Sequence, residues 1–110
     1  MKLNFLGVPV YLNGRNYYIP SLAYPDFKAN YALLTAPAGN LEGDALFAFM
    51  DARIPVIGLA VRRNYSEVTD EQLAAWLDMA TLPLAIQAVA AASGIKPVSQ
   101  TPEGEDEPAA

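Results

Sequence analysis

The stretch Arg62–Asp78, RRNYSEVTDEQLAAWLD, contains the clearest local structural signals in this 110-residue chain. Thr69 and Gln72 form a capping box, in which the Thr69 hydroxyl accepts from the Gln72 N–H and the Gln72 amide returns to the Thr69 N–H. Val68 and Leu73 occupy the N′ and N4 positions of a hydrophobic staple. The apolar positions from Leu73 onward then follow helical spacing. The stretch predicts a helix that begins directly after Thr69.

Two adjacent arginines, Arg62 and Arg63, precede this helix and have two interpretations. Cations at the carboxyl end of a helix stabilise its dipole, and this pair could also form ion pairs with Glu67 or Asp70. Arginine is also enriched among the residues that contribute most to protein–protein interfaces. We expect the pair to stabilise a helix end first and to contact a partner second.

The N-terminal stretch Val8–Pro20, VPVYLNGRNYYIP, is typical of a β-hairpin. Asn13-Gly14 is the preferred pair for a two-residue type I′ turn, because both turn positions need a positive φ. Pro9 and Pro20 lack a backbone N–H and are expected at an edge or a strand end. A lone hairpin is marginally stable in water, so it must pack on helices or extend a partner's sheet.

The central segment predicts a strongly apolar helix. Asn40 is a candidate N-cap, and between Ala45 and Val61 the only charged residues are Asp51 and Arg53. The apolar run is too short and too interrupted to span a membrane. Pro55 is expected to kink this helix or to divide it into two. A helix that is apolar on nearly every side is central to its fold or shared with a neighbour.

Prolines and glycines mark the ends of two further helices. Pro25 suits the first position of a short helix that ends before Pro37. Pro83 suits the first turn of the last helix, and Gly94 is placed as its C′ residue. We therefore predict an α+β, mostly α, single domain over residues 1–96, with an N-terminal β-hairpin (1–22) followed by about four helices (23–96).

The acidic residues are unevenly distributed along the chain. Of the 12 acidic residues, four lie in residues 97–110, which contain no lysine or arginine, so the body has 8 acidic against 7 basic residues. This terminal segment shows no apolar periodicity, and we predict a disordered acidic tail. Neither part has the basic face that nucleic acid requires. No secretory signal pattern is present at the N-terminus, which favours a cytoplasmic location.

The composition argues against an enzyme. The chain contains no cysteine and no histidine, which removes cysteine nucleophiles, the usual general base near neutral pH and the commonest metal ligand. No serine lies in a G-x-S-x-G context, and no glycine-rich phosphate-binding loop is present. We therefore expect a non-catalytic protein without cofactor or metal.

Apolar residues make up 53% of the chain, which is high for so small a body. Some of this apolar surface is expected to meet a partner or a second copy of the chain, making a homo-oligomer plausible. The candidate partner-binding residues are Phe47, Phe49, Ile57, Val61, Arg62, Arg63, Tyr65, Trp76, Ile86 and Val89.

Several of these stretches together suggest a family. The segment LNGRNYYIP near the N-terminus, the helix running into LAVRRNYSEVTDEQLAAWLD, and the following MATLPLAIQAVAAASG resemble the tail assembly chaperones of long-tailed bacteriophages and prophages. The resemblance covers roughly Leu59 to Gly94. Its most specific part is the Arg-Arg-Asn-Tyr step into the capped helix, where related sequences often carry proline in place of Ser66.

The resemblance implies a non-catalytic role. Such chaperones coat the long, aggregation-prone tape measure protein and recruit tail tube subunits to it, so both proteins are the implied partners. The implied location is the cytoplasm of the bacterial host, and the protein is not expected in the mature virion. The alternative is a structural virion component, such as a head–tail or tail completion protein.

Overall fold

The computed structural model describes residues 4–36 and 39–95, which form one two-stranded sheet and five helices. The elements are β1 (Val8–Leu12), β2 (Arg15–Ile19), α1 (Tyr24–Thr35), α2 (Gly43–Asp51), α3 (Ile54–Val61), α4 (Asp70–Trp76) and α5 (Thr81–Ala92). The predicted α+β, mostly helical fold with an N-terminal hairpin is confirmed. The predicted disordered tail, residues 97–110, lies outside the described residues.

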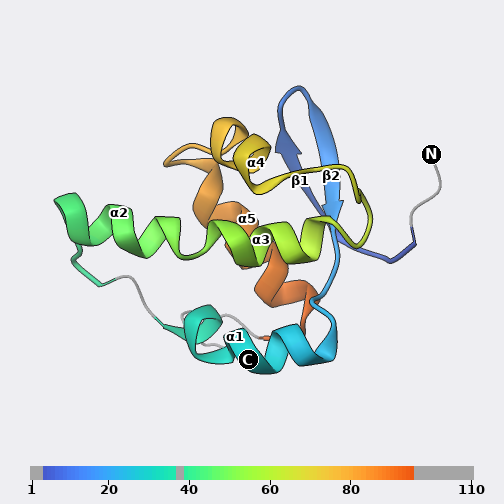
Figure 1. The fold of residues 1–110 in the computed structure, drawn as a ribbon, viewed down its shortest axis with the longest axis horizontal. Coiled ribbons are helices and arrows are strands. Elements are labelled where there is room, and N and C mark those ends of the chain that lie inside the picture. The colour runs from blue at the N-terminus through green and yellow to red at the C-terminus, as the bar shows by residue number, and fades with distance from the viewer. Residues whose placement is uncertain (1–3, 37–38, 96–110) are drawn as a thin grey trace, which may run out of the picture.

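Helix α3 runs through the middle of the molecule, as Figure 1 shows, and α5 crosses it. The hairpin lies at one side of these two helices and α1 lies at the opposite side. Helix α2 continues roughly along the direction of α3 and projects away from the body. In the part of the chain that the structure describes, no helix is both long and apolar enough to cross a membrane.

The hairpin turn has the predicted geometry. Asn13 and Gly14 have φ values of 49° and 84°, and the antiparallel register pairs Leu12 with Arg15 on either side of them. Side chains on one face of the hairpin, including Val10 and Tyr17, are buried, while those on the other face are exposed. The hairpin thus packs one face on the helices and leaves the other in solvent.

Pro55 divides the central apolar segment into α2 and α3. The proline lies in the first turn of α3, where its missing N–H needs no partner, and its ring would clash with the carbonyl of Asp51 in a continuous helix. The division explains why five helices are present. The prediction that Asn40 caps this helix is wrong: α2 begins at Gly43, whose φ of 58° lets the chain turn before the helix starts.

The capping box and staple of α4 are confirmed. The Thr69 N–H donates to Gln72 Oε1 at 2.9 Å, and the Gln72 N–H donates to Thr69 Oγ1 at 3.1 Å. Val68 and Leu73, the two staple residues, are both buried. Reciprocal bonds of this kind satisfy two of the free N–H groups at a helix start.

Helix α5 is capped at both ends. At its start, Asp78 Oδ1 accepts from the N–H groups of Ala80 (2.9 Å) and Thr81 (2.8 Å), a cap that the sequence reasoning did not single out. At its end, Gly94 has a φ of 94°, and the Ile95 N–H donates to the Ala90 carbonyl at 2.9 Å. This is a Schellman motif, and it confirms Gly94 as the C′ residue.

The hydrophobic core lies between the inner face of the hairpin, α3 and α5. Its buried members are Val10, Leu12, Tyr17, Ile19, Leu22, Val56, Ile57, Ala60, Val61, Tyr65, Val68, Leu73, Leu77, Leu82, Ala85, Ala88 and Val89. Neither α1 nor α2 contains a fully buried residue. These two helices therefore lie outside the core, and their apolar side chains are the first place to look for a binding surface.

Candidate protein-binding surface

Arg62 makes the ion pair that one interpretation of the sequence anticipated. Its Nη1 donates to Asp70 Oδ1 at 2.8 Å and to the Val68 carbonyl at 3.2 Å. The Arg62 and Asp70 side chains are 32% and 43% exposed, so solvent screens the pair and its contribution is modest. The contact ties the end of α3 to the start of α4.

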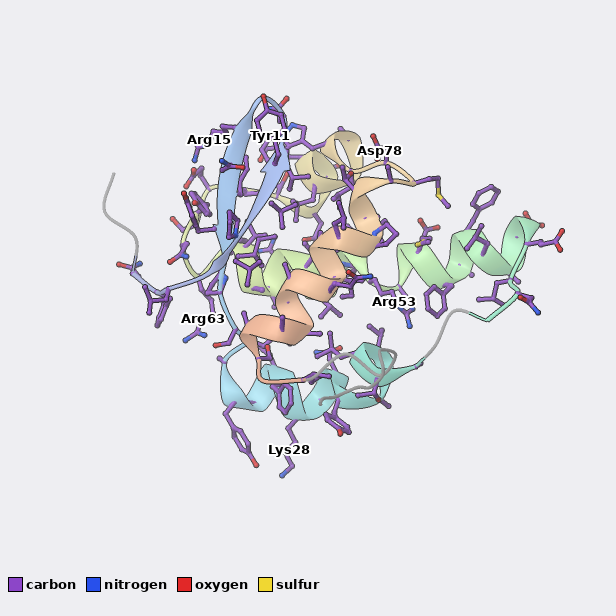
Figure 2. The ribbon with its side chains drawn as sticks, turned by 180° about the vertical axis from the view of Figure 1, so that it is seen from behind. Tyr11, Arg15, Lys28, Arg53, Arg63 and Asp78 are labelled. Atoms are coloured by element: carbon purple, nitrogen blue, oxygen red, sulfur yellow. The ribbon has the colours of Figure 1, made fainter. Side chains whose placement is uncertain are left out.

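Arg63 reaches in another direction, toward the N-terminal part of the chain. Its Nη1 donates to the Ser21 carbonyl at 2.7 Å, and its guanidinium carbon lies 3.9 Å from the centre of the Phe5 ring. Figure 2 labels Arg63 at the side of the molecule where the hairpin strands leave the sheet. Both arginines of the pair thus make contacts within their own chain.

Asn64 and Tyr65 cover the outer edge of β2. Asn64 Oδ1 accepts from the Phe5 N–H at 2.9 Å, while Asn64 Nδ2 donates to the carbonyls of Phe5 (3.0 Å) and Tyr18 (2.9 Å). Tyr65 Oη accepts from the Tyr18 N–H at 2.9 Å. In the alternating antiparallel ladder, Tyr18 and Pro9 form a non-hydrogen-bonded pair, so the Tyr18 N–H and carbonyl point away from β1. The Asn64 amide therefore binds this edge as a neighbouring strand would.

Two of the predicted aromatic residues belong to one cluster under the hairpin. The ring of Tyr17 stacks on half-buried Trp76, with centroids 5.4 Å apart, and meets Tyr65 edge-on at 4.9 Å. Offset stacking and edge-to-face contacts are the favoured geometries for aromatic pairs. Tyr65 is buried in the core, and half-buried Trp76 of α4 packs against the core.

Four of the ten candidate partner-binding residues lie in the hydrophobic core. Ile57, Val61 and Val89 are buried because α3 and α5 turn these positions toward the hairpin or toward each other. Tyr65, in the connection after α3, is buried against Tyr17 of the hairpin. In this conformation their side chains contribute to folding, and a partner could reach them only if the domain opened. The accessible candidates are therefore to be sought on α2 and on the outward face of α5.

Phe49 and Ile86, two further candidates, lie together in a groove of about 260 Å³ between α1, α2 and α5. The groove is mostly apolar, and its lining residues are Leu33, Leu34, Ala36, Phe49, Met50, Arg53, Leu82, Pro83, Ile86, Gln87 and Ala90. The sequence reasoning missed the leucines from α1, because no local pattern shows that α1 lies beside α2 and α5.

Arg53 lies at the base of this groove and is only 6% exposed. Its Nη1 donates to the Phe49 carbonyl at 2.7 Å, and its Nη2 donates to the Leu33 carbonyl at 3.0 Å. Figure 2 shows Arg53 between the helices. Burial lowers the pKa of Arg53, yet an arginine remains charged at neutral pH. The guanidinium thus binds carbonyls near the carboxyl ends of α1 and α2, where helix dipoles favour a cation.

Phe47 is the most exposed of the candidates, with 55% of its surface accessible. It lies on α2, which projects from the body in Figure 1 and has no buried residue. Leu46, Phe49 and Met50 of the same helix are half-buried. We refer to the exposed apolar side of α2, together with the adjoining groove, as the α2–groove surface; its principal residues are Leu33, Leu46, Phe47, Phe49, Met50 and Ile86.

Comparison of this chain with protein-family models, with curated proteins and with solved structures finds no match. Function is therefore inferred from the residues and their arrangement. The arrangement brings two predicted candidates, Phe49 and Ile86, into one groove and leaves a third, Phe47, exposed on α2. It assigns intramolecular contacts to Arg62 and Arg63.

Proposed function

We propose that this protein is a non-catalytic phage tail assembly chaperone that binds the tape measure protein and helps to recruit tail tube subunits. It would act in the cytoplasm of the bacterial host and be absent from the mature virion. The observation that supports this proposal most directly is the α2–groove surface, where apolar side chains remain accessible outside the core. The sequence resemblance supports the same role.

The structure of α2 suits a binding element. An isolated helix of nine residues is too short to be stable in water, and most helical stability comes from packing an apolar face. Yet α2 has no fully buried residue, and its contacts with the body lie near its C-terminal end, where half-buried Phe49 and Met50 line the groove. A client helix laid along α2 would supply the missing packing, in the manner of helix-in-groove recognition.

The chemistry of the surface also fits stoichiometric binding. The groove is lined by aliphatic and aromatic side chains, and its one charged lining residue, Arg53, is engaged with two backbone carbonyls. Its described lining residues contain no pair of nucleophile and base. Apolar contact is what such a surface offers to a helical, aggregation-prone client.

Co-expression with the tape measure protein of the same phage or prophage tests the proposal. We expect the two proteins to co-purify and the soluble yield of the tape measure protein to rise. Failure of both effects would argue strongly against a chaperone. Proteomics of purified virions adds a second test, because a stoichiometric amount of this protein in mature particles would favour a structural virion component instead.

A further inference from the structure

Helix α2 carries acidic residues and no accessible cation. The segment from Gly39 to Ala52, GNLEGDALFAFMDA, contains Glu42, Asp44 and Asp51 but no lysine or arginine. The only ion pair in the described ranges joins Arg62 to Asp70, on other helices. The carboxylates of α2 are thus exposed charges beside an exposed apolar side chain.

The spacing of these residues places an aromatic ring between two carboxylates. Phe47 follows Asp44 by three positions and precedes Asp51 by four, so all three side chains lie on the same side of the helix. Met50, three positions after Phe47, lines the groove. One continuous apolar band therefore runs from Phe47 into the groove, with acidic groups along its outer border.

We propose that the α2–groove surface docks an amphipathic helix of another protein whose apolar stripe is bordered by lysine or arginine. The apolar stripe would cover Phe47 and Met50, and the cations would pair with Asp44 and Asp51. This inference rests on the proposed function and makes it specific, because it states the chemistry of the client segment. Complementary charge of this kind fixes register and raises the association rate more than it adds affinity.

A second copy of this chain fits the surface less well. Pairing α2 with α2 of a second copy would bring carboxylates against carboxylates, which is repulsive. The described basic residues also offer no cationic helix: Arg53, Arg62 and Arg63 hydrogen-bond within the chain, Arg15 lies over an aromatic ring, and Lys28 stands by itself on α1.

The size of the surface points to the same kind of occupant. Helix α2 is only about 14 Å long, at about 1.5 Å per residue. A stable interface buries about 800 Å² on each partner, which is more than one face of so short a helix offers. A longer partner helix that continues from Phe47 into the groove beside Ile86 would gain the additional contact area. A long helix is therefore a better occupant than a short loop.

Two synthetic helical peptides test the inference with the full-length chain. Both are about 18 residues long, or about 27 Å of helix, and share one stripe of leucines. One carries lysine at the positions beside the stripe, and the other carries glutamate. We expect fluorescence anisotropy to show binding of the lysine peptide, weakened by added salt, and no binding of the glutamate peptide.

Variants then locate the binding site. Phe47→Ala should weaken binding of the lysine peptide by about tenfold or more, as truncation of a central aromatic anchor does. The double variant Asp44→Asn/Asp51→Asn should weaken it severalfold and flatten its salt dependence. The control Glu67→Gln/Glu71→Gln removes the same charge from exposed positions near α4 and should leave binding unchanged. Since α2 buries no residue, both test variants should keep the circular dichroism spectrum of the wild type.

Three results would overturn the inference. The first is equal binding of the two peptides, and the second is equal loss of binding in the test and control charge variants, which would indicate non-specific attraction. The third is a wild-type dimer, measured by light scattering, that Phe47→Ala converts to a monomer, because the occupant would then be a second copy.

The outcomes also separate this inference from the proposed function. If the tape measure protein co-purifies as well with the Phe47→Ala variant as with the wild type, the docking site is wrong and the chaperone role remains. If the lysine peptide binds at Phe47 but no tape measure protein co-purifies, the docking chemistry stands and the chaperone role falls.

Discussion

Replacing Asn64 with aspartate should destabilise the fold without changing its shape. Asn64 is 6% exposed, and its Nδ2 donates to the carbonyls of Phe5 (3.0 Å) and Tyr18 (2.9 Å). In the Asn64→Asp variant a carboxylate oxygen takes the place of this donor. Two hydrogen bonds are lost, and the two carbonyls then face a negative charge that is largely removed from water.

The magnitude follows from these contacts. Loss of a hydrogen bond whose acceptor is rehydrated costs about 1 kcal/mol, whereas a buried carbonyl left without any partner costs about 1–3 kcal/mol. The Phe5 side chain is partly exposed, so water can rehydrate its backbone more easily than that of Tyr18. We expect the free energy of unfolding to fall by about 2–4 kcal/mol at neutral pH, which would lower the thermal midpoint by about 10–20 °C in a domain of this size.

The loss should depend on pH with a definite sign. Burial beside two carbonyls raises the folded-state pKa of the introduced carboxyl above its unfolded value of about 3.9. Its ionised form is the destabilising one, so the full penalty is present above the folded pKa and diminishes as the pH falls below it. The protonated carboxyl can also donate one of the two lost bonds. The gap between variant and wild type should therefore narrow in acid.

Urea unfolding followed by the fluorescence of Trp76, the single tryptophan, measures these differences. Asn16→Asp is the matched control, because Asn16 lies on β2 with an exposed side chain. The explanation would be refuted if Asn64→Asp unfolded within about 0.5 kcal/mol of the wild type at neutral pH, or if the control lost as much stability.

Three further substitutions test local contacts. A Cβ at Gly58 would overlap Asp70 Oδ1 and crowd the Arg62 guanidinium, so Gly58→Ala should break the ion pair and lower the stability of the wild type. In an Asp70→Ala background the flexible end of Arg62 is free to move aside, and Gly58→Ala should raise stability by about 1 kcal/mol through helix propensity. A double-mutant cycle in urea measures both effects. Thr69→Ala removes the side-chain cap of α4 and should lower the free energy of unfolding by about 1 kcal/mol in the same assay. Thr35→Ala, at an exposed position of α1, is the control. Hydrogen bonds from the Thr81 backbone and side chain and from the Ala80 N–H lower the pKa of Asp78 below its usual 3.8. The wild type should therefore be more stable than Asp78→Asn above that pH, and this difference in stability should disappear as the pH falls through the lowered pKa. Equal urea midpoints of the two proteins at neutral pH would contradict this.

The local features could be predicted because the interacting groups are close in sequence. The Asn13-Gly14 turn, the Thr69–Gln72 capping box and the C′ position of Gly94 each depend on residues within a few positions. The break at Pro55 depends only on the missing N–H and the ring of one residue. Asp78 shows the limit of such reasoning, since its cap lies in a short connection without the usual box pattern.

The candidate surface could be predicted only in part. The central segment is apolar on nearly every side, so the sequence indicated burial and binding without distinguishing the two. Packing against the hairpin made Ile57 and Val61 part of the core, whereas Phe47, beyond the break before Pro55, remained exposed. The position of α1 then completed the groove, and α1 is held there by the bond from Arg53 to the Leu33 carbonyl and by apolar side chains that pack against the core.

By itself the sequence determined where the hairpin turns, where α4 begins, where α5 ends and where Pro55 interrupts the central helix. Only the tertiary structure decided the roles of Arg63 and Asn64, because their partners Ser21, Phe5 and Tyr18 are 42 to 59 positions away. Short-range signals are encoded in neighbouring side chains, whereas contacts at such separations exist only once the hairpin has packed on the end of α3.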